Sequence, residues 1–220
     1  MSQFTILLGG DLKVTRRLIR QVAGTRVIAA DSGMRHAAAL RTDAELWVGD
    51  FDSAEADLQR RHPQTPRDVH PADKDRTDGE IAIDAALAKG ASALILAGGL
   101  GGQTDHALAH VMQMLALALR GIPTLISSGS EEAYPLLPGR RRLELPPGSR
   151  LSVIALGGLT GLDLEGVRWP LAKADIPLGS TRTLSNVTVE PVVEIGLAAG
   201  SGIVLAYPAE EAGREVAHCE

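Results

Sequence analysis

Cysteine is nearly absent from this 220-residue sequence, which contains only Cys219. A single cysteine cannot close an intramolecular disulfide, and it cannot build a cysteine-based zinc site. We therefore expect neither kind of cross-link, and a reducing compartment is the simple inference.

Long basic segments are also lacking. The formal net charge is −5, and no block of Lys or Arg is longer than Arg140–Arg142. Such a chain exerts no long-range attraction on nucleic acid or on an anionic membrane. We expect no nucleic-acid partner and no membrane partner, and a small anionic ligand that brings its own cation fits the composition better.

Long hydrophobic runs are missing as well. The N-terminal run Phe4–Leu8 is too short for a signal peptide and ends at Gly9-Gly10-Asp11. The apolar segment Ala107–Leu119 falls below the roughly 20 residues that a membrane span needs. The sequence thus predicts a soluble, cytoplasmic protein.

The first half of the chain alternates short apolar runs with longer amphipathic segments, which is typical of βα units around a parallel sheet. The helix expected from Asp78 has the clearest start, because Thr77 and Glu80 form a capping box and Gly90 supplies a C-terminal stop. The expected strands are Thr5–Leu8, Arg26–Ala30, Leu46–Val48, Asp68–His70, Ala93–Ala97 and Thr124–Ser127, and the expected helices are Leu12–Val22, Met34–Leu40, Ala54–Arg61, Asp78–Lys89 and His106–Leu119.

The second half, after Pro138-Gly139, consists of short β-rich segments separated by Gly and Pro, the pattern of a small all-β sandwich or barrel. We expect an α/β domain with a parallel sheet over residues 1–130, an all-β domain over residues 142–209 and a polar tail over residues 210–220. The expected strands of the second domain are Leu151–Leu156, Leu162–Val167, Thr181–Leu184, Val187–Val189, Val192–Ile195 and Ile203–Tyr207.

Aspartates follow four of the predicted strands in the first half. Their carboxylates fall at the carboxyl ends of the strands, which is the edge where open parallel sheets bind ligands. Residues distant in sequence are therefore expected to converge there. These aspartates are Asp31, Asp50, Asp52, Asp73, Asp75, Asp78 and Asp105.

Two interpretations of the aspartates are open. An Asp after a strand often caps the next helix, and capping accounts equally well for Asp31 or Asp105 taken alone. It does not account for Asp50 and Asp52, which point the same way in an extended segment, or for three carboxylates in the loop 73–78. Their mutual repulsion favours a hard divalent cation, most simply Mg²⁺ that carries nucleotide phosphates.

Glycine-rich segments follow two of the strands. Gly98–Gly102 precedes a predicted helix, so its backbone N–H groups suit phosphate oxygens, although a tight turn is an equally good interpretation. The segment is not a P-loop, because no Gly-Lys-Ser/Thr follows. Gly9-Gly10 carries the same ambiguity, and Lys74 and Arg76 suit either a triphosphate or the neighbouring aspartates. His106 and His110 are more typical of one helix face than of a metal site.

Six segments, in this order, carry a family resemblance. Together they resemble the thiamine pyrophosphokinase family over nearly the whole chain. The segments are Asp31-Ser32-Gly33, Gly49–Ser53, Asp73–Asp78, Gly98–His106, Gly166–Leu171 and Leu184-Ser185-Asn186.

The resemblance implies a reaction in which ATP donates a pyrophosphoryl group to the hydroxyl of thiamine, with Mg²⁺ as cofactor and AMP as the second product. The thiamine oxygen would attack the β-phosphorus in line, and Asp78 or Asp52 would accept its proton. The resemblance also implies an N-terminal catalytic domain, a β domain that helps to bind thiamine, and a homodimer with the active site at the interface.

The resemblance assigns roles to individual residues. The implied catalytic residues are Asp50, Asp52 and Asp78, and the implied metal-binding residues are Asp50, Asp52, Asp73, Asp75 and Asp78. The implied nucleotide-binding residues are Asp31, Ser32, Asp75, Thr77, Gly101, Gln103 and Asp105. The implied substrate-binding residues are Asp105, Ser185 and Asn186, whereas Trp169 is expected to be structural.

Two positions depart from the family pattern. Gln103 stands where the family usually has an arginine, so a fixed positive charge is lost at the phosphates, at a cost of about 1 kcal/mol unless another cation substitutes. Val187-Thr188-Val189 supplies no aromatic ring to stack on thiamine, so that ring must come from elsewhere. Two alternatives therefore stay open: pyrophosphorylation of a hydroxymethyl pterin, and a ligand-binding relative with little activity.

Overall fold

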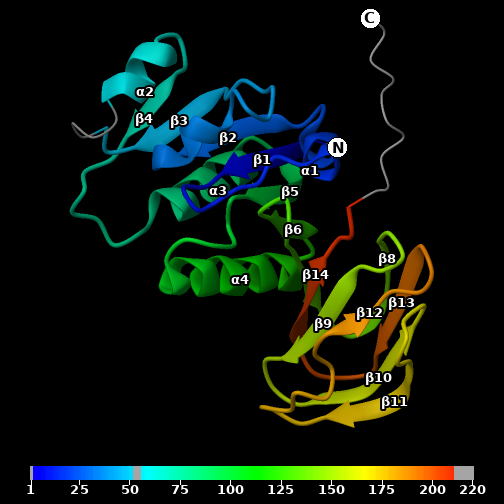
Figure 1. The fold of residues 1–220 in the computed structure, drawn as a ribbon. Coiled ribbons are helices and arrows are strands. Elements are labelled where there is room, and N and C mark those ends of the chain that lie inside the picture. The colour runs from blue at the N-terminus through cyan, green and yellow to red at the C-terminus, as the bar shows by residue number, and fades with distance from the viewer. Residues whose placement is uncertain (1, 52–55, 211–220) are drawn as a thin grey trace, which may run out of the picture. The chain divides into compact units, whose positions relative to one another are not determined.

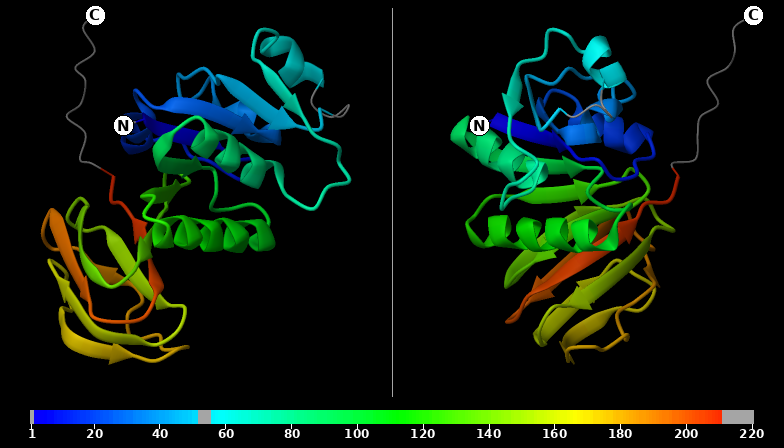
Figure 2. Two further views of the ribbon diagram at one scale, coloured as in Figure 1. Left: turned by 180° about the vertical axis from the view of Figure 1, so that it is seen from behind. Right: turned by 90° about the vertical axis from the view of Figure 1, so that its left-hand side faces the viewer.

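The computed structural model describes residues 2–51 and 56–210 (Figure 1). The chain divides into two compact units, of which the first ends at Tyr134 and the second begins at Pro135. All helices of the described chain belong to the first unit, as Figure 2 also shows. In the ranges 2–51 and 56–210, no helix combines the length and the apolar character of a membrane span.

The first unit is built on a mostly parallel sheet in which the strands follow the order β7-β6-β5-β1-β2-β3-β4. Neighbouring strands pair in parallel, except that β6 and β7 are antiparallel. The expected α/β class is therefore confirmed. The elements are β1 (Ser2–Leu7), α1 (Arg16–Val22), β2 (Arg26–Ala30), η1 (Asp31–His36), β3 (Leu46–Gly49), α2 (Ala56–Arg61), β4 (Arg67–Val69), α3 (Asp78–Ala88), β5 (Ala91–Ala97), α4 (Thr104–Leu119), β6 (Thr124–Ser127) and β7 (Glu132–Leu136), whose last two residues belong to the second unit.

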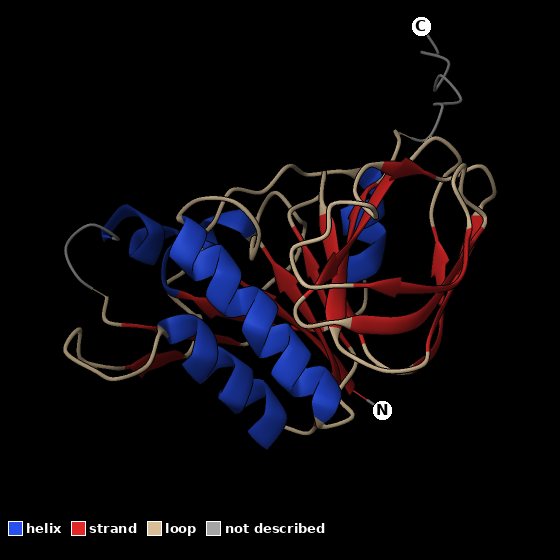
Figure 3. Ribbon diagram, turned by 90° about the horizontal axis from the view of Figure 1, so that it is seen from below, coloured by secondary structure: helices blue, strands red, loops and turns tan. Residues whose placement is uncertain are grey.

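Both faces of this sheet are covered. Leu7, Ala29 and Trp47 are fully buried on one face, in a cluster that includes residues of α1 and η1. Their neighbours Ile6 and Ile28 are equally buried and, because side chains alternate along a strand, point to the opposite face. There α3 packs against β1, β2, β3 and β5, and Figure 3 shows α3 and α4 side by side. Burial on two faces explains why these strands are continuous apolar runs.

The helix boundaries near the carboxyl edge follow from capping. The Thr77 hydroxyl accepts the Glu80 backbone N–H at 3.2 Å, which confirms the expected start of α3, and Gly90 supplies the left-handed residue beyond its end with φ +84°. α1 begins at Arg16 rather than near Leu12, because the Thr15 side chain caps it by accepting the Leu18 N–H at 3.1 Å.

The strands of the second unit pair antiparallel and belong to two sheets, which confirms the expected all-β class. One contains the strands in the order β12-β9-β14, and the other has the order β11-β10-β13-β8. Alternate residues such as Leu162 and Leu164, or Val193 and Ile195, are buried. The elements are β8 (Gly139–Glu144), β9 (Arg150–Ala155), β10 (Leu159–Glu165), β11 (Leu171–Ile176), β12 (Asn186–Val187), β13 (Val192–Leu197) and β14 (Gly202–Tyr207).

Several predicted elements are wrong. The expected helix Met34–Leu40 is instead the 3₁₀ helix η1, which starts directly at the end of β2. The expected strand Thr181–Leu184 is a turn, closed by the Leu184 N–H to the Thr181 carbonyl at 3.1 Å. The strands β7, β8 and β11 were not predicted; β8 carries three arginines, so its composition is that of an edge strand rather than of an apolar run.

Candidate active site

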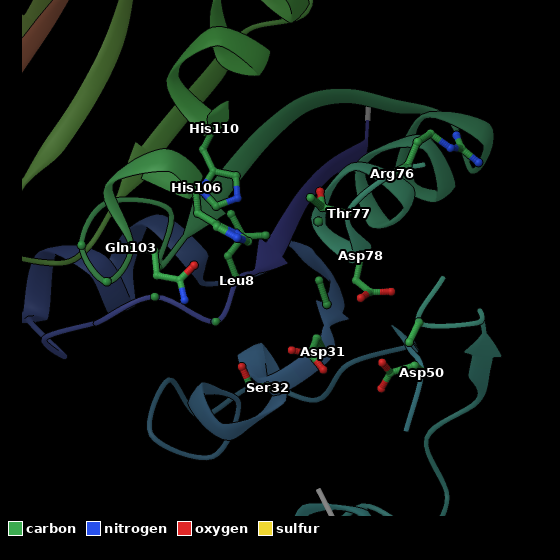
Figure 4. Close-up of a pocket in the computed structure, with 18 of the residues that line it drawn as sticks. Leu8, Asp31, Ser32, Asp50, Arg76, Thr77, Asp78, Gln103, His106 and His110 are labelled. Carbon is green, nitrogen blue, oxygen red and sulfur yellow. The ribbon is translucent and has the colours of Figure 1, made fainter. Parts of the chain in front are cut away.

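A cavity of about 480 Å³ opens in the first unit. Its walls come from the segments that follow β1, β2, β3 and β5, together with the start of α3 and the first turns of α4 (Figure 4). This is the carboxyl edge of the parallel sheet, where ligands are expected. The lining residues are Leu8, Gly9, Gly10, Ala30, Asp31, Ser32, Asp50, Ala72, Lys74, Arg76, Thr77, Asp78, Gly79, Gly98, Gly101, Gly102, Gln103, His106 and His110.

Two glycine segments lie backbone against backbone in the cavity wall. A Cβ added at Gly10 would lie 2.3 Å from the Gly98 carbonyl oxygen and 3.0 Å from that of Gly101. Gly98 and Gly101 themselves have φ of +80° and +95°, a region that favours glycine. The close approach leaves peptide groups as the wall of the cavity, where N–H groups suit phosphate oxygens.

The first glycine segment is held from behind by η1. The Arg35 guanidinium donates to the carbonyls of Gly9 and Gly10, and the His36 Nε2 lies 3.0 Å from the Gly10 carbonyl. Burial lowers the pKa of His36 below its ordinary value. Sequence analysis missed this support, because Arg35 and His36 follow the Asp31-Ser32-Gly33 motif without belonging to it.

Asp31 is fixed by its backbone. Its φ is +49°, in the left-handed region, and its carbonyl accepts the indole N–H of Trp47 at 2.9 Å. The Trp47 ring packs edge to face against Phe51 at 4.9 Å, and Phe51 also has a positive φ of +56°. One buried tryptophan thus orders two of the loops that carry cavity carboxylates.

Three predicted carboxylate side chains line the same cavity. Figure 4 shows Asp31, Asp50 and Asp78 on the side of the cavity away from Gln103. The Lys74 ammonium lies 3.1 Å from the Asp78 Oδ1, with 14% and 18% of the two side chains exposed. That oxygen is shielded from solvent and accepts no hydrogen bond from the described residues, so the contact is electrostatic.

These observations test whether the site suits Mg²⁺. The Asp78 Oδ1 is buried and accepts no hydrogen bond from the described residues, although the Lys74 ammonium lies 3.1 Å away, and a carboxylate oxygen is the kind of ligand that a hard divalent cation takes. Within residues 2–51 and 56–210, no group of three or more His, Cys, Asp or Glu is close enough to hold a metal. Asp52 lies outside the described residues. Any cation at this cavity would therefore need further oxygen ligands from a bound molecule such as a phosphate.

The remaining predicted residues of the first unit are more dispersed. Asp73 and Asp75 are exposed and do not line the cavity, while Thr77 lines it and also caps α3. Ser32, Gly101 and Gln103 line the cavity. Asp105 does not, and its Oδ1 accepts the backbone N–H of His106 at 2.9 Å.

Two histidines that sequence analysis left without a role also line the cavity. His106 and His110 lie one helical turn apart on α4, with ring centroids 6.3 Å apart. The His110 Nδ1 lies 3.1 Å from the Gly99 carbonyl, and burial lowers the pKa of His110. Their i, i+4 spacing was the available signal, and it is consistent with either a helix face or a site.

In the second unit, Asn186 is buried and holds the backbone of Trp169. The Asn186 Nδ2 donates to the Trp169 carbonyl at 2.8 Å, and its Oδ1 accepts the Trp169 N–H at 3.2 Å. Ser185 has φ +58°, and its N–H donates to the Ser152 hydroxyl at 3.0 Å. Trp169 itself is 56% exposed, so the expectation that it is a structural residue is not met.

Two family models match the chain. The model described as "Thiamin pyrophosphokinase, catalytic domain" matches residues 21–126, and that described as "Thiamin pyrophosphokinase, vitamin B1 binding domain" matches residues 141–201. A thiamine pyrophosphokinase of Bacillus subtilis (strain 168) is 30% identical over 142 residues, which are 63% of this chain and 66%, slightly under two thirds, of that relative.

Solved structures share the fold. A thiamine pyrophosphokinase structure from Bacillus subtilis has a TM-score of 0.83 at 24% identity and covers 94% of this chain and 99% of its own. A thiamin pyrophosphokinase from Candida albicans has a TM-score of 0.77 at 11% identity, over 94% of this chain and 89% of its own. At these identities the structures support the fold alone. With a catalytic model matching in the first unit and a vitamin B1 binding model in the second, this chain belongs to the thiamin pyrophosphokinase family.

Proposed function

We propose that this chain is an ATP-dependent thiamine pyrophosphokinase, which converts thiamine and ATP into thiamine diphosphate and AMP. The observation that carries the proposal is the cavity at the carboxyl edge of the sheet, where a wall of glycine peptides faces Asp31, Asp50 and Asp78. Peptide N–H groups suit phosphate oxygens, and the carboxylates suit the cation that accompanies them.

Mg²⁺ would be held by Asp50 and Asp78 together with Asp52. When bound, such an ion neutralises phosphate charge and polarises the phosphoryl group. Asp50 and Asp78 offer carboxylate oxygens to the ion, whereas the glycine segments offer peptide N–H groups to phosphate, so metal binding and phosphate binding use different donors. Asp73 and Asp75 are kept in this proposal as residues of the same acidic loop, in the outer part of the site.

The chemical step is a displacement at phosphorus. The thiamine hydroxyl oxygen forms a bond to the β-phosphorus, the bond from that phosphorus to the oxygen bridging to the α-phosphate breaks, and AMP leaves with that oxygen. The hydroxyl proton passes to a carboxylate, for which Asp78 and Asp52 are the candidates. Positioning of the two reactants and stabilisation of phosphate charge supply most of the acceleration.

The nucleotide has other contacts in the proposed site. We assign Asp31, Ser32, Gly101 and Gln103 to it, since all four line the cavity. Thr77, Asp75 and Asp105 complete the assigned set. Lys74 also lines the cavity and supplies a positive charge that the neutral Gln103 lacks, although the 3.1 Å contact with Asp78 shares that charge with a carboxylate.

Thiamine recognition is assigned to the second unit. We propose that Ser185 and Asn186 contact thiamine, and that Asn186 also acts by fixing the backbone of Trp169. The Ser185 N–H is itself held by the Ser152 hydroxyl. The exposed indole of Trp169 supplies the aromatic surface that the segment after Asn186 does not provide. A cationic thiazolium ring is a favourable partner for such a surface. Asp105 remains a proposed substrate contact.

The proposal includes a homodimer with the active site at its interface, in the cytoplasm where ATP is available. α4 exposes Leu108, Met112 and Leu119, and no charged residue occurs between Ala107 and Leu119. An apolar face of this kind, repeated on an identical chain, is suited to self-association.

The test is an assay of AMP release from ATP by the purified chain. AMP is expected only when both thiamine and Mg²⁺ are present, and EDTA should abolish its release. A hydroxymethyl pterin in place of thiamine tests the alternative acceptor. Release without any acceptor would contradict the proposal, and tight thiamine or ATP binding without turnover would favour a binding protein.

A further inference from the structure

His110 lies where three parts of the cavity wall meet. It belongs to α4, its Nδ1 lies 3.1 Å from the carbonyl oxygen of Gly99, and a Cβ added at Gly79 near the start of α3 would lie 3.6 Å from its Nε2. The residue is 9% exposed, and Figure 4 shows it among the lining residues near His106 and Leu8. One imidazole therefore contacts elements that are distant in the sequence.

Leu8 occupies the same junction from the end of β1. A Cβ at Gly79 would lie 2.9 Å from the Leu8 Cδ2, and a Cβ at Gly99 would lie 3.2 Å from the Leu8 Cδ1. Both glycines therefore leave space that Leu8 fills. The His110 Nδ1 lies at Gly99 and its Nε2 lies at Gly79. Leu8 and His110 thus lie against both the glycine loop, residues 98–102, and the start of α3.

The Gly99 carbonyl at this junction needs a hydrogen-bond donor. A carbonyl oxygen is an acceptor, so the Nδ1 of His110 carries the proton and donates to Gly99, which leaves the Nε2 as the unprotonated nitrogen. Burial of the ring and the charge of the nearby His106 lower the pKa of His110, which favours this neutral form. A leucine of similar size would fill the space and leave the carbonyl without its donor.

We infer that His110 is a positioning residue that holds the glycine loop 98–102 at a fixed place relative to the start of α3, and that it thereby sets the affinity for the ATP phosphates. The inference rests on the proposed function for the identity of the nucleotide. It assigns His110 no contact with substrate and no part in proton transfer.

The experiment compares His110→Leu with His110→Asn. The Asn Nδ2 occupies the position of the His Nδ1, so His110→Asn keeps the donor to Gly99, whereas His110→Leu keeps the volume alone. Gln113→Leu is the matched control, because Gln113 is a partly buried residue of the same helix that does not line the cavity. Calorimetry with ATP and Mg²⁺, without thiamine, measures nucleotide affinity, and thermal unfolding is recorded for each variant.

We expect His110→Leu to weaken ATP binding about 10-fold or more, as misplaced supporting groups do, and to raise the KM for ATP by a similar factor. His110→Asn should restore the affinity to within about threefold of the parent chain, since only the second nitrogen is lost. The KM for thiamine should change little in either variant, and Gln113→Leu should resemble the parent chain.

Equal ATP affinity in His110→Leu and the parent chain would overturn the inference, as would equal losses in the Leu and Asn variants. If His110→Leu does not unfold cooperatively, the test rests on His110→Asn alone. An ATP affinity of His110→Asn far below that of the parent chain would then refute the role of the bond to Gly99. A parent chain that binds ATP but releases no AMP with thiamine would refute the proposed function, and the affinity comparison would still test His110.

Discussion

The contact between the two glycine segments predicts a large effect for Gly10→Ala. The new methyl group would lie 2.3 Å from the Gly98 carbonyl oxygen, whereas unstrained carbon contacts lie at roughly 3.5–4.0 Å. The neighbouring Gly101 oxygen, at 3.0 Å, blocks relief in a second direction, so the two segments must separate by about 1 Å. A displacement of that size at a phosphate-binding wall is expected to lower kcat/KM by about 100-fold.

The same substitution has a smaller effect on folding. Overpacking costs about 1–3 kcal/mol, and the loss of glycine flexibility in the unfolded chain returns about 0.4–1 kcal/mol of it, so a folded variant is expected. Chemical denaturation measures the change in the free energy of unfolding, and the AMP assay measures the change in kcat/KM. Gly157→Ala is the control, since a Cβ there meets no atom within 4 Å. Activity of Gly10→Ala within about threefold of the parent chain would refute the reasoning, because a factor of three corresponds to less than 1 kcal/mol.

Three further predictions follow from contacts in the two units. Glu132→Ala removes a buried partner of Arg17, at 2.7 Å and 1% exposed, and should lower the free energy of unfolding by about 3 kcal/mol in a urea titration; an unchanged midpoint would contradict this. Burial lowers the pKa of His36 and of His110, so the folded state binds fewer protons than the unfolded one, and stability should fall as the pH decreases below about 6.5. The double variant His36→Asn, His110→Asn should show a smaller loss of melting temperature below this pH. A slope equal to that of the parent chain would refute the assignment of the pH dependence to these two histidines. Trp169→Ala should raise the KM for thiamine roughly 10-fold while Trp169→Phe retains most affinity, and equal effects on the KM for ATP would argue against a stacking role.

The helices and strands could be predicted where neighbouring residues alone determine them, as in an apolar run or a capping box. β2 and β6 have the expected bounds, because each contains a short buried apolar run that polar or turn residues delimit. The start of α3 followed from its capping box. η1 was missed because it starts at Asp31, directly after β2 and in a left-handed conformation. The spacing of apolar residues does not report such a start.

The candidate site was predictable to the extent that it depends on strand ends. Asp31, Asp50 and Asp78 follow from topology, since parallel strands bring their carboxyl ends to one edge. The supporting residues could not be predicted in this way. Arg35 holds backbone carbonyls from a neighbouring loop, and His110 meets a glycine whose position depends on the packing of two helices. Such partners have no fixed spacing in the sequence.

The two tryptophans also allow the two units to be followed separately by fluorescence. Trp47 is fully buried and bonded beside the carboxylate loops of the first unit, whereas Trp169 is 56% exposed in the second. Their emission should therefore differ in wavelength and in access to a soluble quencher such as iodide. Each half of the molecule thus carries one intrinsic probe, so unfolding or ligand binding in one half can be followed separately from the other without any label.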